Sequence, residues 1–165
     1  MNSVMIEKVT VNMGVGKTGD DLKKAKQIME KITGSKPVET KCKVKQPKWE
    51  IRPGLPIGVK VTLRNSNATE FLKVALAAKD NQLRRKNFDM QGNFGFGVKE
   101  HIDLPNIKYD PKLGIRGFDV LVSLKKAGYR LKRRKIAKRK IGKNQLVTKN
   151  EAMEFVKKEF GVEII

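Results

Sequence analysis

A glycine-rich turn near the N-terminus has the residue types of a phosphate-binding site: Gly14-Val15-Gly16-Lys17-Thr18-Gly19. It fits the G-x-G-x-x-G pattern of dinucleotide-binding proteins, and its middle part resembles the end of a P-loop. Dinucleotide binding also needs a parallel strand that ends in an acid, but Glu39 lies near the start of a lysine-rich segment. A P-loop needs a glycine five residues before Gly16, where this chain has Val11. Nucleotide chemistry is therefore the weaker alternative, and we expect a close turn whose exposed N–H groups are available to a phosphate.

Other routes to catalysis have little support in the residues. His101 has Glu100 and Asp103 as neighbours and could act as a general base, but a lone histidine at a strand end is usually a surface or packing residue. Cys42 lies in an alternating segment and is more typical of a small core residue than of a nucleophile. One cysteine and one histidine can form neither an internal disulfide nor a metal cluster. We expect no enzyme, no cofactor and no metal, in a reducing intracellular compartment.

The charge of the chain is its strongest signal. Lysine and arginine number 37 against 17 acids, which gives a formal net charge of +20 and a sequence pI of about 10.2. Such a charge requires a polyanionic partner, either nucleic acid or an anionic membrane. No stretch approaches the roughly 18 apolar residues of a membrane-spanning helix, and the N-terminus lacks the pattern of a signal peptide. We therefore expect a nucleic-acid partner and no membrane.

Two basic segments are the candidate contacts with that partner. Residues 129–143 hold nine lysines or arginines and no acid, so RNA or DNA contact is favoured over a solvated face or a nuclear-localisation signal. Residues 41–54 place Lys41, Lys43, Lys45, Lys48 and Arg52 near a single tryptophan, Trp49. That ring could stack on RNA or anchor the loop to the protein body, and the sequence favours neither. A general nucleic-acid packaging protein is a further class to test.

The elements that position these residues follow from periodicity, caps and breakers. Alternation predicts strands at residues 5–13, 38–44, 57–63, 94–98 and 118–124. Helical spacing predicts helices from Asp20 or Asp21 to Ile32, from a cap at Asn67 to about Lys79, and after a capping box at Thr148 up to Gly161. Three prolines and a glycine between residues 46 and 56 rule out a tight hairpin and predict a long exposed loop.

This order lacks regular βαβ alternation and predicts an α+β fold, with a mostly antiparallel sheet and helices packed on one face. We expect residues 1–128 to form an RNA-binding domain with a long basic loop at 41–56. Residues 129–165 are expected to add a basic tract and a C-terminal helix.

Five segments in order resemble the universal large-subunit ribosomal protein five family, which carries 5S ribosomal RNA. They are residues 9–16 (VTVNMGVG), 34–38 (GSKPV), 51–64 (IRPGLPIGVKVTLR), 88–100 (FDMQGNFGFGVKE) and 116–119 (RGFD). The chain lacks the N-terminal helical arm of bacterial members and adds the basic tract. It therefore resembles the archaeal type, equivalent to eukaryotic large-subunit protein eleven. Bacterial relatives usually have Glu where this chain has Lys17, so phosphate contacts at that turn are expected to differ.

The resemblance implies a non-catalytic scaffold protein of the cytoplasmic ribosome, in the central protuberance. It implies that 5S rRNA is contacted by Asn12, Met13, Gly14, Ser35, Lys36, Thr62 and Arg64. It implies that the loop with Lys41, Lys43, Lys45, Lys48, Trp49 and Arg52 approaches the peptidyl-site tRNA. Other RNA contacts are expected at Tyr129, Arg130, Lys132, Arg133 and Arg134, and the sequence does not say which RNA this tract meets. Large-subunit rRNA is an expected partner of the protein. Further partners would be neighbouring large-subunit proteins and small-subunit protein thirteen, through a bridge near residues 84–93.

Overall fold

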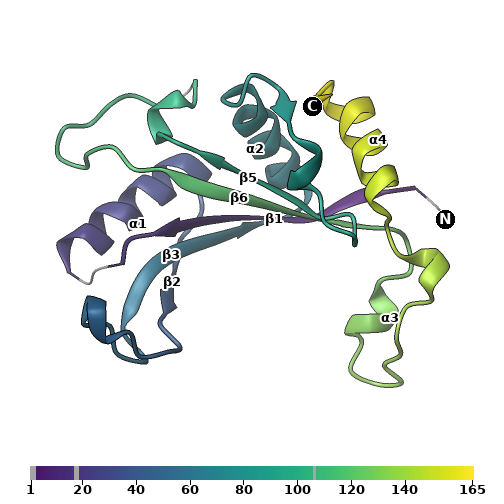
Figure 1. Ribbon diagram of the computed structural model, residues 1–165, viewed down its shortest axis with the longest axis horizontal. Helices are drawn as coiled ribbons and strands as arrows, with labels where there is room; N and C mark the ends of the chain where they lie inside the picture. The colour runs from purple at the N-terminus through teal and green to yellow at the C-terminus, as the bar shows by residue number, and fades with distance from the viewer. Residues whose placement is uncertain (1–2, 17–18, 106) are drawn as a thin grey trace. The chain divides into compact units, whose positions relative to one another are not determined.

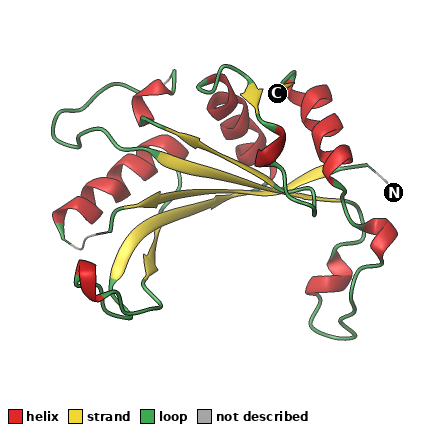
Figure 2. Cartoon of the chain, in the orientation of Figure 1, coloured by secondary structure: helices red, strands yellow, loops and turns green. Residues whose placement is uncertain are grey.

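The computed structural model describes residues 3–16, 19–105 and 107–165. The strands are β1 (Met5–Gly14), β2 (Val38–Lys41), β3 (Pro56–Leu63), β4 (Gln82–Leu83), β5 (Phe94–Val98), β6 (Phe118–Lys125) and β7 (Glu163–Ile164) (Figure 1). The α-helices are α1 (Asp20–Thr33), α2 (Asn65–Ala77), α3 (Arg130–Arg133) and α4 (Lys149–Phe160). Short 3-10 turns interrupt the loops, for example at Pro47–Trp49 (Figure 2).

The larger sheet has the strand order β2-β3-β1-β6-β5, and β4 pairs with β7 in a small parallel sheet. β2 runs antiparallel to β3, with Val38 opposite Lys60 and Thr40 opposite Gly58. The predicted α+β fold with a mostly antiparallel sheet is confirmed. β1 and β2 are separated by β3, so the parallel βαβ unit of a dinucleotide-binding fold is absent from the described part of this sheet.

The chain forms two compact units that interleave along the sequence. Unit 1 comprises residues 1–9, 64–96 and 121–165, and unit 2 comprises residues 10–63 and 97–120. Along the sequence, the division between the two units falls within β1, β5 and β6. Unit 1 therefore contains both the C-terminal segment 129–165 and part of the predicted domain of residues 1–128.

Unit 2 buries helix α1 against the sheet. Alternate residues of β1 and β3 are buried, among them Val11, Met13, Val59, Val61 and Leu63, as the period of two predicts. α1 contributes Leu22, Ala25, Ile28 and Met29 to the same core and ends at Gly34, whose left-handed backbone caps the helix. The helix position predicted from the sequence is confirmed.

Unit 1 buries the apolar faces of α2 and α4. α2 contributes Phe71, Leu72, Ala75 and Leu76, and α4 contributes Ala152 and Val156. The predicted capping box of α4 is confirmed: Thr148 Oγ1 accepts from the Glu151 N–H at 3.4 Å, and the Thr148 N–H donates to Glu151 Oε2 at 2.9 Å. Gly161 ends the helix in the left-handed conformation.

Three local predictions are wrong. The strand predicted at residues 38–44 ends at Lys41, because its register against β3 shifts between Thr40 and Lys41. α2 begins at Asn65 after an extended Arg64 that makes no side-chain cap bond, so the predicted cap Asn67 lies inside the helix. Cys42 is half-exposed in the loop, where its Sγ lies 2.9 Å from the Val44 carbonyl oxygen, and is not a core residue.

Gly58, in β3 of unit 2, has little room for a side chain. A Cβ there would lie 2.8 Å from Thr40 Oγ1 and 2.9 Å from the backbone oxygen of Met13. We expect Gly58→Ala to lower the free energy of unfolding by about 1–3 kcal/mol, because the backbone oxygen cannot rotate away. Urea unfolding measures the difference. Gly14→Ala is the matched control, since nothing lies within 4 Å of a Cβ at Gly14. Equal stability of the two variants would contradict the tight contact at Gly58.

Candidate nucleic-acid interface

Unit 2 presents a polar sheet face, defined here by Asn12, Thr40, Lys60 and Thr62. Asn12, Lys60 and Thr62 alternate with buried neighbours, so their side chains lie on the side of the sheet opposite the core. Thr40 lies opposite Gly58, two positions from Lys60, and therefore on the same side. Lys60 and Thr62 are exposed, whereas Asn12 and Thr40 are half-buried. The face therefore offers hydroxyl and amide groups, which donate and accept, together with a single cation. Such groups fix register on RNA sugars and phosphates without concentrating charge.

The glycine turn after β1 differs from its predicted role. The N–H groups of Val15 and Gly16 both donate to the carbonyl of Ile57, at 3.0 and 2.8 Å, and so extend the pairing of β1 with β3. The prediction that exposed amides of this turn are available to a phosphate is therefore wrong for these two residues. Met13 is 1% exposed and is therefore a core residue, buried as a whole. Gly14 is exposed, and Lys17 and Thr18 lie outside the described residues.

The end of α1 presents a second predicted contact. Gly34 donates its N–H to the Glu30 carbonyl at 2.8 Å, and the Ser35 N–H donates to Thr33 Oγ1 at 3.4 Å. These bonds hold the backbone of the turn, from which an exposed Lys36 follows. Arg64, at the start of α2 in unit 1, is also exposed. The structure thus leaves both cations accessible to solvent.

The loop between β2 and β3, residues 42–55, is braced at two levels. At its base the Cys42 N–H donates to the Leu55 carbonyl at 2.8 Å, and the Gly54 N–H donates to the Cys42 carbonyl at 2.9 Å. Near its tip Gln46 and Ile51 exchange backbone bonds of 2.9 and 3.2 Å. The loop is therefore long, as predicted, but it is not irregular throughout.

The cations of this loop and of the adjoining strand end are exposed. Lys41, Lys43, Lys45, Lys48 and Arg52 are all exposed, and no ion pair between described residues holds any of them. Glu50 is the one acid among residues 41–54. Cations on a braced loop can neutralise phosphates without first giving up salt bridges inside the protein.

Trp49 lies in the 3-10 turn near the tip of the loop and is 71% exposed. Of the two roles that the sequence left open, anchoring to the protein body does not fit this exposure. An indole ring in solvent carries an apolar face that a base or another ring could cover.

The basic segment, residues 129–143 of unit 1, is partly engaged within the protein. Arg133 forms an ion pair with Glu7 of β1, and Arg134 Nε donates to the Ala137 carbonyl at 2.8 Å. Arg130 and Lys132 are exposed and form no ion pair between described residues. The five residues predicted here from the sequence therefore differ in their contacts: Arg133 and Arg134 have internal partners, Tyr129 is half-buried, and Arg130 and Lys132 are available to a ligand.

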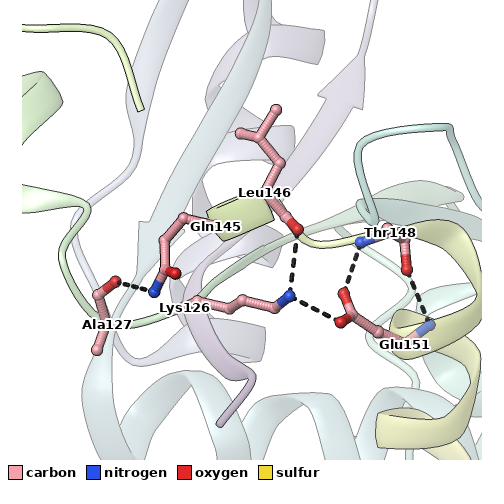
Figure 3. A network of polar contacts seen from close by, with 6 residues as sticks. All are labelled: Lys126, Ala127, Gln145, Leu146, Thr148 and Glu151. Atoms are coloured by element: carbon pink, nitrogen blue, oxygen red, sulfur yellow. Dashed lines mark hydrogen bonds and ion pairs between the residues drawn. The ribbon is translucent and has the colours of Figure 1, made fainter. Parts of the chain in front are cut away.

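A polar network holds the two ends of the basic segment (Figure 3). Lys126, 4% exposed, donates to Glu151 Oε1 at 2.7 Å and to the Leu146 carbonyl at 3.3 Å. Gln145 Nε2 donates to the Ala127 carbonyl at 3.0 Å. The hydrogen bond from Lys126, with the bond from the Thr148 N–H, holds the pKa of Glu151 below its ordinary value. The segment is thus tied at its base to the end of β6 and the start of α4.

The residues considered for catalysis have structural roles. His101 is 3% exposed, and its Nδ1 accepts from the Arg116 N–H at 3.4 Å, while its backbone N–H donates to the Arg116 carbonyl at 3.0 Å. His101 is therefore a packing residue. The described residues contain no group of three or more His, Cys, Asp and Glu that could hold a metal ion. Among the helices described, none has the length and apolar character needed to cross a membrane.

Sequence reasoning missed two basic residues, Lys60 and Lys8. Lys60 shares the sheet face with Thr62, and the period of two in β3 already placed the two residues on one side. Lys8 of β1 and Lys138, Arg139 and Lys140 of the basic segment line one cavity in unit 1. No sequence signal links Lys8 to residues so distant in the chain.

Comparison with known proteins gives a consistent result over nearly the whole chain. Residues 1–52 match the family model "Ribosomal protein L5", and residues 56–155 match the model for the C-terminus of the same ribosomal family. Large ribosomal subunit protein uL5 of Methanococcus aeolicus is 48% identical, over 99% of this chain and 92% of the relative. The same protein of Nanoarchaeum equitans is 46% identical over 100% and 98%, and that of Pyrobaculum aerophilum is 48% identical over 99% and 92%.

Proposed function

The chain belongs to the ribosomal protein L5 family, and from this premise we propose that it fixes 5S rRNA in the central protuberance and contacts peptidyl-site tRNA. As a family member it is a structural constituent of the large subunit in the cytoplasm and not an enzyme. Its partners are rRNA and the ribosome. The archaeal relatives match the archaeal type to which the sequence pointed.

The sheet face of unit 2 binds 5S rRNA. The observation that carries this proposal is the mostly uncharged polar surface formed by Asn12, Lys60 and Thr62 on adjacent strands. Ser35 and Lys36 add to this contact, and the exposed Gly14 contributes through its backbone. Arg64, in unit 1, supplies a separate contact with the same RNA. RNA recognition of this kind depends on shape and on sugar and phosphate contacts, which need short, fixed side chains.

The 42–55 loop, with Lys41 at its base, contacts peptidyl-site tRNA. Support comes from its braced backbone, its five exposed cations and the exposed ring of Trp49. The cations neutralise tRNA phosphates, and the indole covers an apolar part of the tRNA surface. Arg130 and Lys132 of the basic segment, both exposed, make further contacts with RNA.

The turn at residues 89–93 belongs to the bridge towards small-subunit protein thirteen and to contacts with neighbouring large-subunit proteins. Asp89 Oδ1 accepts the N–H groups of Gln91 and Asn93 at 2.9 and 2.7 Å, which makes the turn rigid. Met90 at its tip is 87% exposed. An apolar side chain on a rigid turn supports a protein contact at this position.

Asn12→Ala is expected to weaken 5S rRNA binding by about tenfold, because it removes one or two neutral hydrogen bonds. The dependence of affinity on salt should hardly change, since no charge is removed. Filter binding of 5S rRNA over a range of potassium concentrations measures both quantities. Lys60→Gln, on the same face, is the matched comparison and should lower the salt slope. A lower slope for Asn12→Ala would contradict a positioning role.

The same binding assay separates the proposed function from its rivals. A packaging protein would bind duplex DNA and 5S rRNA with similar affinity at moderate salt, whereas the proposed function requires a clear preference for 5S rRNA. Calorimetric titration with ATP, GTP and NAD tests the nucleotide alternative. Saturable micromolar binding of any of these would contradict the proposal.

A further inference from the structure

A cavity of about 640 Å³ lies within unit 1 where the basic segment meets β1 and β6. Its lining includes five cations: Lys8, Lys132, Lys138, Arg139 and Lys140. No ion pair between described residues neutralises any of them. The cavity therefore has a strongly positive potential, because all five charges border one hollow.

The one acid of the lining does not change this sign. Glu7 forms an ion pair with Arg133, and its side chain is 15% exposed. Its charge is thus already balanced from within the protein. The pair also fixes α3 to β1, which holds the basic wall of the cavity in place.

The same cavity is lined by neutral polar groups and an aromatic ring. Gln91, Asn93, Ser123 and Tyr129 supply amide, hydroxyl and phenol groups. Asn93 Nδ2 donates to Asp89 Oδ2 at 2.9 Å, which leaves the side-chain oxygen of Asn93 as an acceptor. Such groups recognise the edges of a base, and a ring supports its face.

Hydrogen bonds within the protein hold the backbone around the cavity in place without a ligand. The Arg139 N–H donates to the Leu131 carbonyl at 3.3 Å and closes the loop that carries the cations. The bonds from Lys126 to Glu151 and from Gln145 to Ala127 hold both ends of the segment. A ligand therefore need not order this backbone, which reduces the entropic cost of binding.

We propose that this cavity binds one unpaired RNA nucleotide, with its phosphates on the cations and its base against the polar lining. The inference rests on the proposed function as a ribosomal RNA-binding protein. A volume of this order suits a small ligand and is larger than a lone phosphate requires. An A-form duplex keeps its bases stacked inside and could offer only phosphates, so the neutral lining would stay unused. Cations and base-recognising groups together select an unstacked nucleotide.

Ser123→Phe tests the proposal, because it fills the cavity without changing the charge. We expect it to weaken binding of short unstructured oligouridine or oligoadenosine by about tenfold, as exclusion of one base from its site would. Binding of a short blunt RNA duplex should stay within about twofold of the unmodified chain, since phosphate contacts remain. Fluorescence anisotropy with the whole chain measures both. Leu121→Phe is the matched control: Leu121 lies two positions away in β6, is 51% exposed and does not line the cavity.

Two double variants test the role of the cavity cations without relying on the stability of Ser123→Phe. Lys138→Gln with Lys140→Gln removes two cations of the cavity, and Lys157→Gln with Lys158→Gln removes two exposed cations of α4. We expect the cavity pair to weaken oligonucleotide binding by about tenfold more than the α4 pair does. Equal effects of the two pairs would overturn the proposal.

Three other results would overturn it. They are unchanged oligonucleotide binding by a folded Ser123→Phe variant, an equal weakening of duplex binding, and displacement of the RNA by oligoglutamate at equal charge concentration. The last would show that a polyanion such as an acidic peptide suffices. The affinity of the unmodified chain for 5S rRNA is measured in parallel. Absence of a 5S preference with intact cavity binding would refute the proposed function alone.

Discussion

Replacing Lys41, Lys43, Lys45, Lys48 and Arg52 together with glutamine is expected to lower RNA affinity by about two to three orders of magnitude at low salt. All five side chains are exposed, and no ion pair between described residues holds them, so their charges are free to displace counterions from phosphates. The slope of log affinity against log salt should fall by about 0.7 to 0.9 for each phosphate that is no longer neutralised. Filter binding of tRNA across a salt series measures both quantities.

The matched control removes five lysines from helices: Lys24, Lys73, Lys149, Lys157 and Lys158. Their removal changes the net charge by the same amount but leaves the braced loop intact. We expect a much smaller fall in slope. If both sets reduced the slope equally, tRNA would be responding to the overall charge of the protein and the loop would have no special role. Folding of each variant is checked by circular dichroism.

Glu151→Gln replaces the carboxylate with a neutral amide of similar shape. It is expected to lower the free energy of unfolding by about 2 kcal/mol. Lys126 is 4% exposed, so the substitution leaves a buried ammonium with only the Leu146 carbonyl as acceptor and an uncharged amide nearby. This loss is smaller than the usual cost of breaking a buried ion pair, because the Glu151 side chain itself is 40% exposed. Glu154→Gln, on the exposed side of the same helix, should change stability by less than about 0.5 kcal/mol.

Lys126→Met provides the opposite test of this pair. Methionine removes the buried charge and fills a similar volume, so it should cost less than Glu151→Gln. Urea unfolding of both single variants and of the double variant gives the coupling energy. If Lys126→Met proved the more destabilising, the lysine would be stabilising unit 1 mainly through Leu146 and not through the carboxylate.

The pair also predicts how stability depends on pH. The pKa of Glu151 is lowered from its ordinary value of 4.5, chiefly by the hydrogen bond from Lys126. A carboxyl whose pKa is lower in the folded state contributes stability above its unfolded pKa, and loses it as pH falls through the folded pKa. The difference between the original chain and Glu151→Gln should therefore be full at neutral pH and shrink below about pH 4.5. Urea unfolding at a series of pH values measures it.

Local patterns in the sequence predicted most of the fold. The alternation in residues 5–13 and 118–124, and the capping box at Thr148, depend on neighbours a few positions away, so they can be read without the rest of the chain. The end of β2 could not be predicted, because the register shift at Lys41 is imposed by β3. The start of α2 was missed because Asn67 with Glu70 has the sequence pattern of a cap, whereas Arg64, which occupies the cap position, has none.

The exposure and internal partners of the candidate site residues could be predicted only in part. Composition and charge indicated which segments are candidates for RNA contact, and the family resemblance added Asn12 and Thr62. Neither could show that Arg133 is paired with Glu7, since that contact joins parts of the chain far apart in sequence. For the same reason the cavity that unites Lys8 with residues 138–140 becomes evident only in three dimensions.

Because the two units interleave along the chain, neither can fold from one continuous stretch. Unit 2 must bring residues 97–120 back to residues 10–63, and unit 1 must join three separate segments. Closing such long chain loops before native contacts form costs entropy and slows folding. A fragment that stopped at residue 63 would leave β1 without its hydrogen-bonded neighbour β6. During synthesis the cationic loop therefore emerges well before its supporting sheet is complete. For a time the new chain carries exposed positive charge that attracts polyanions non-specifically, before the sheet that positions this charge has formed.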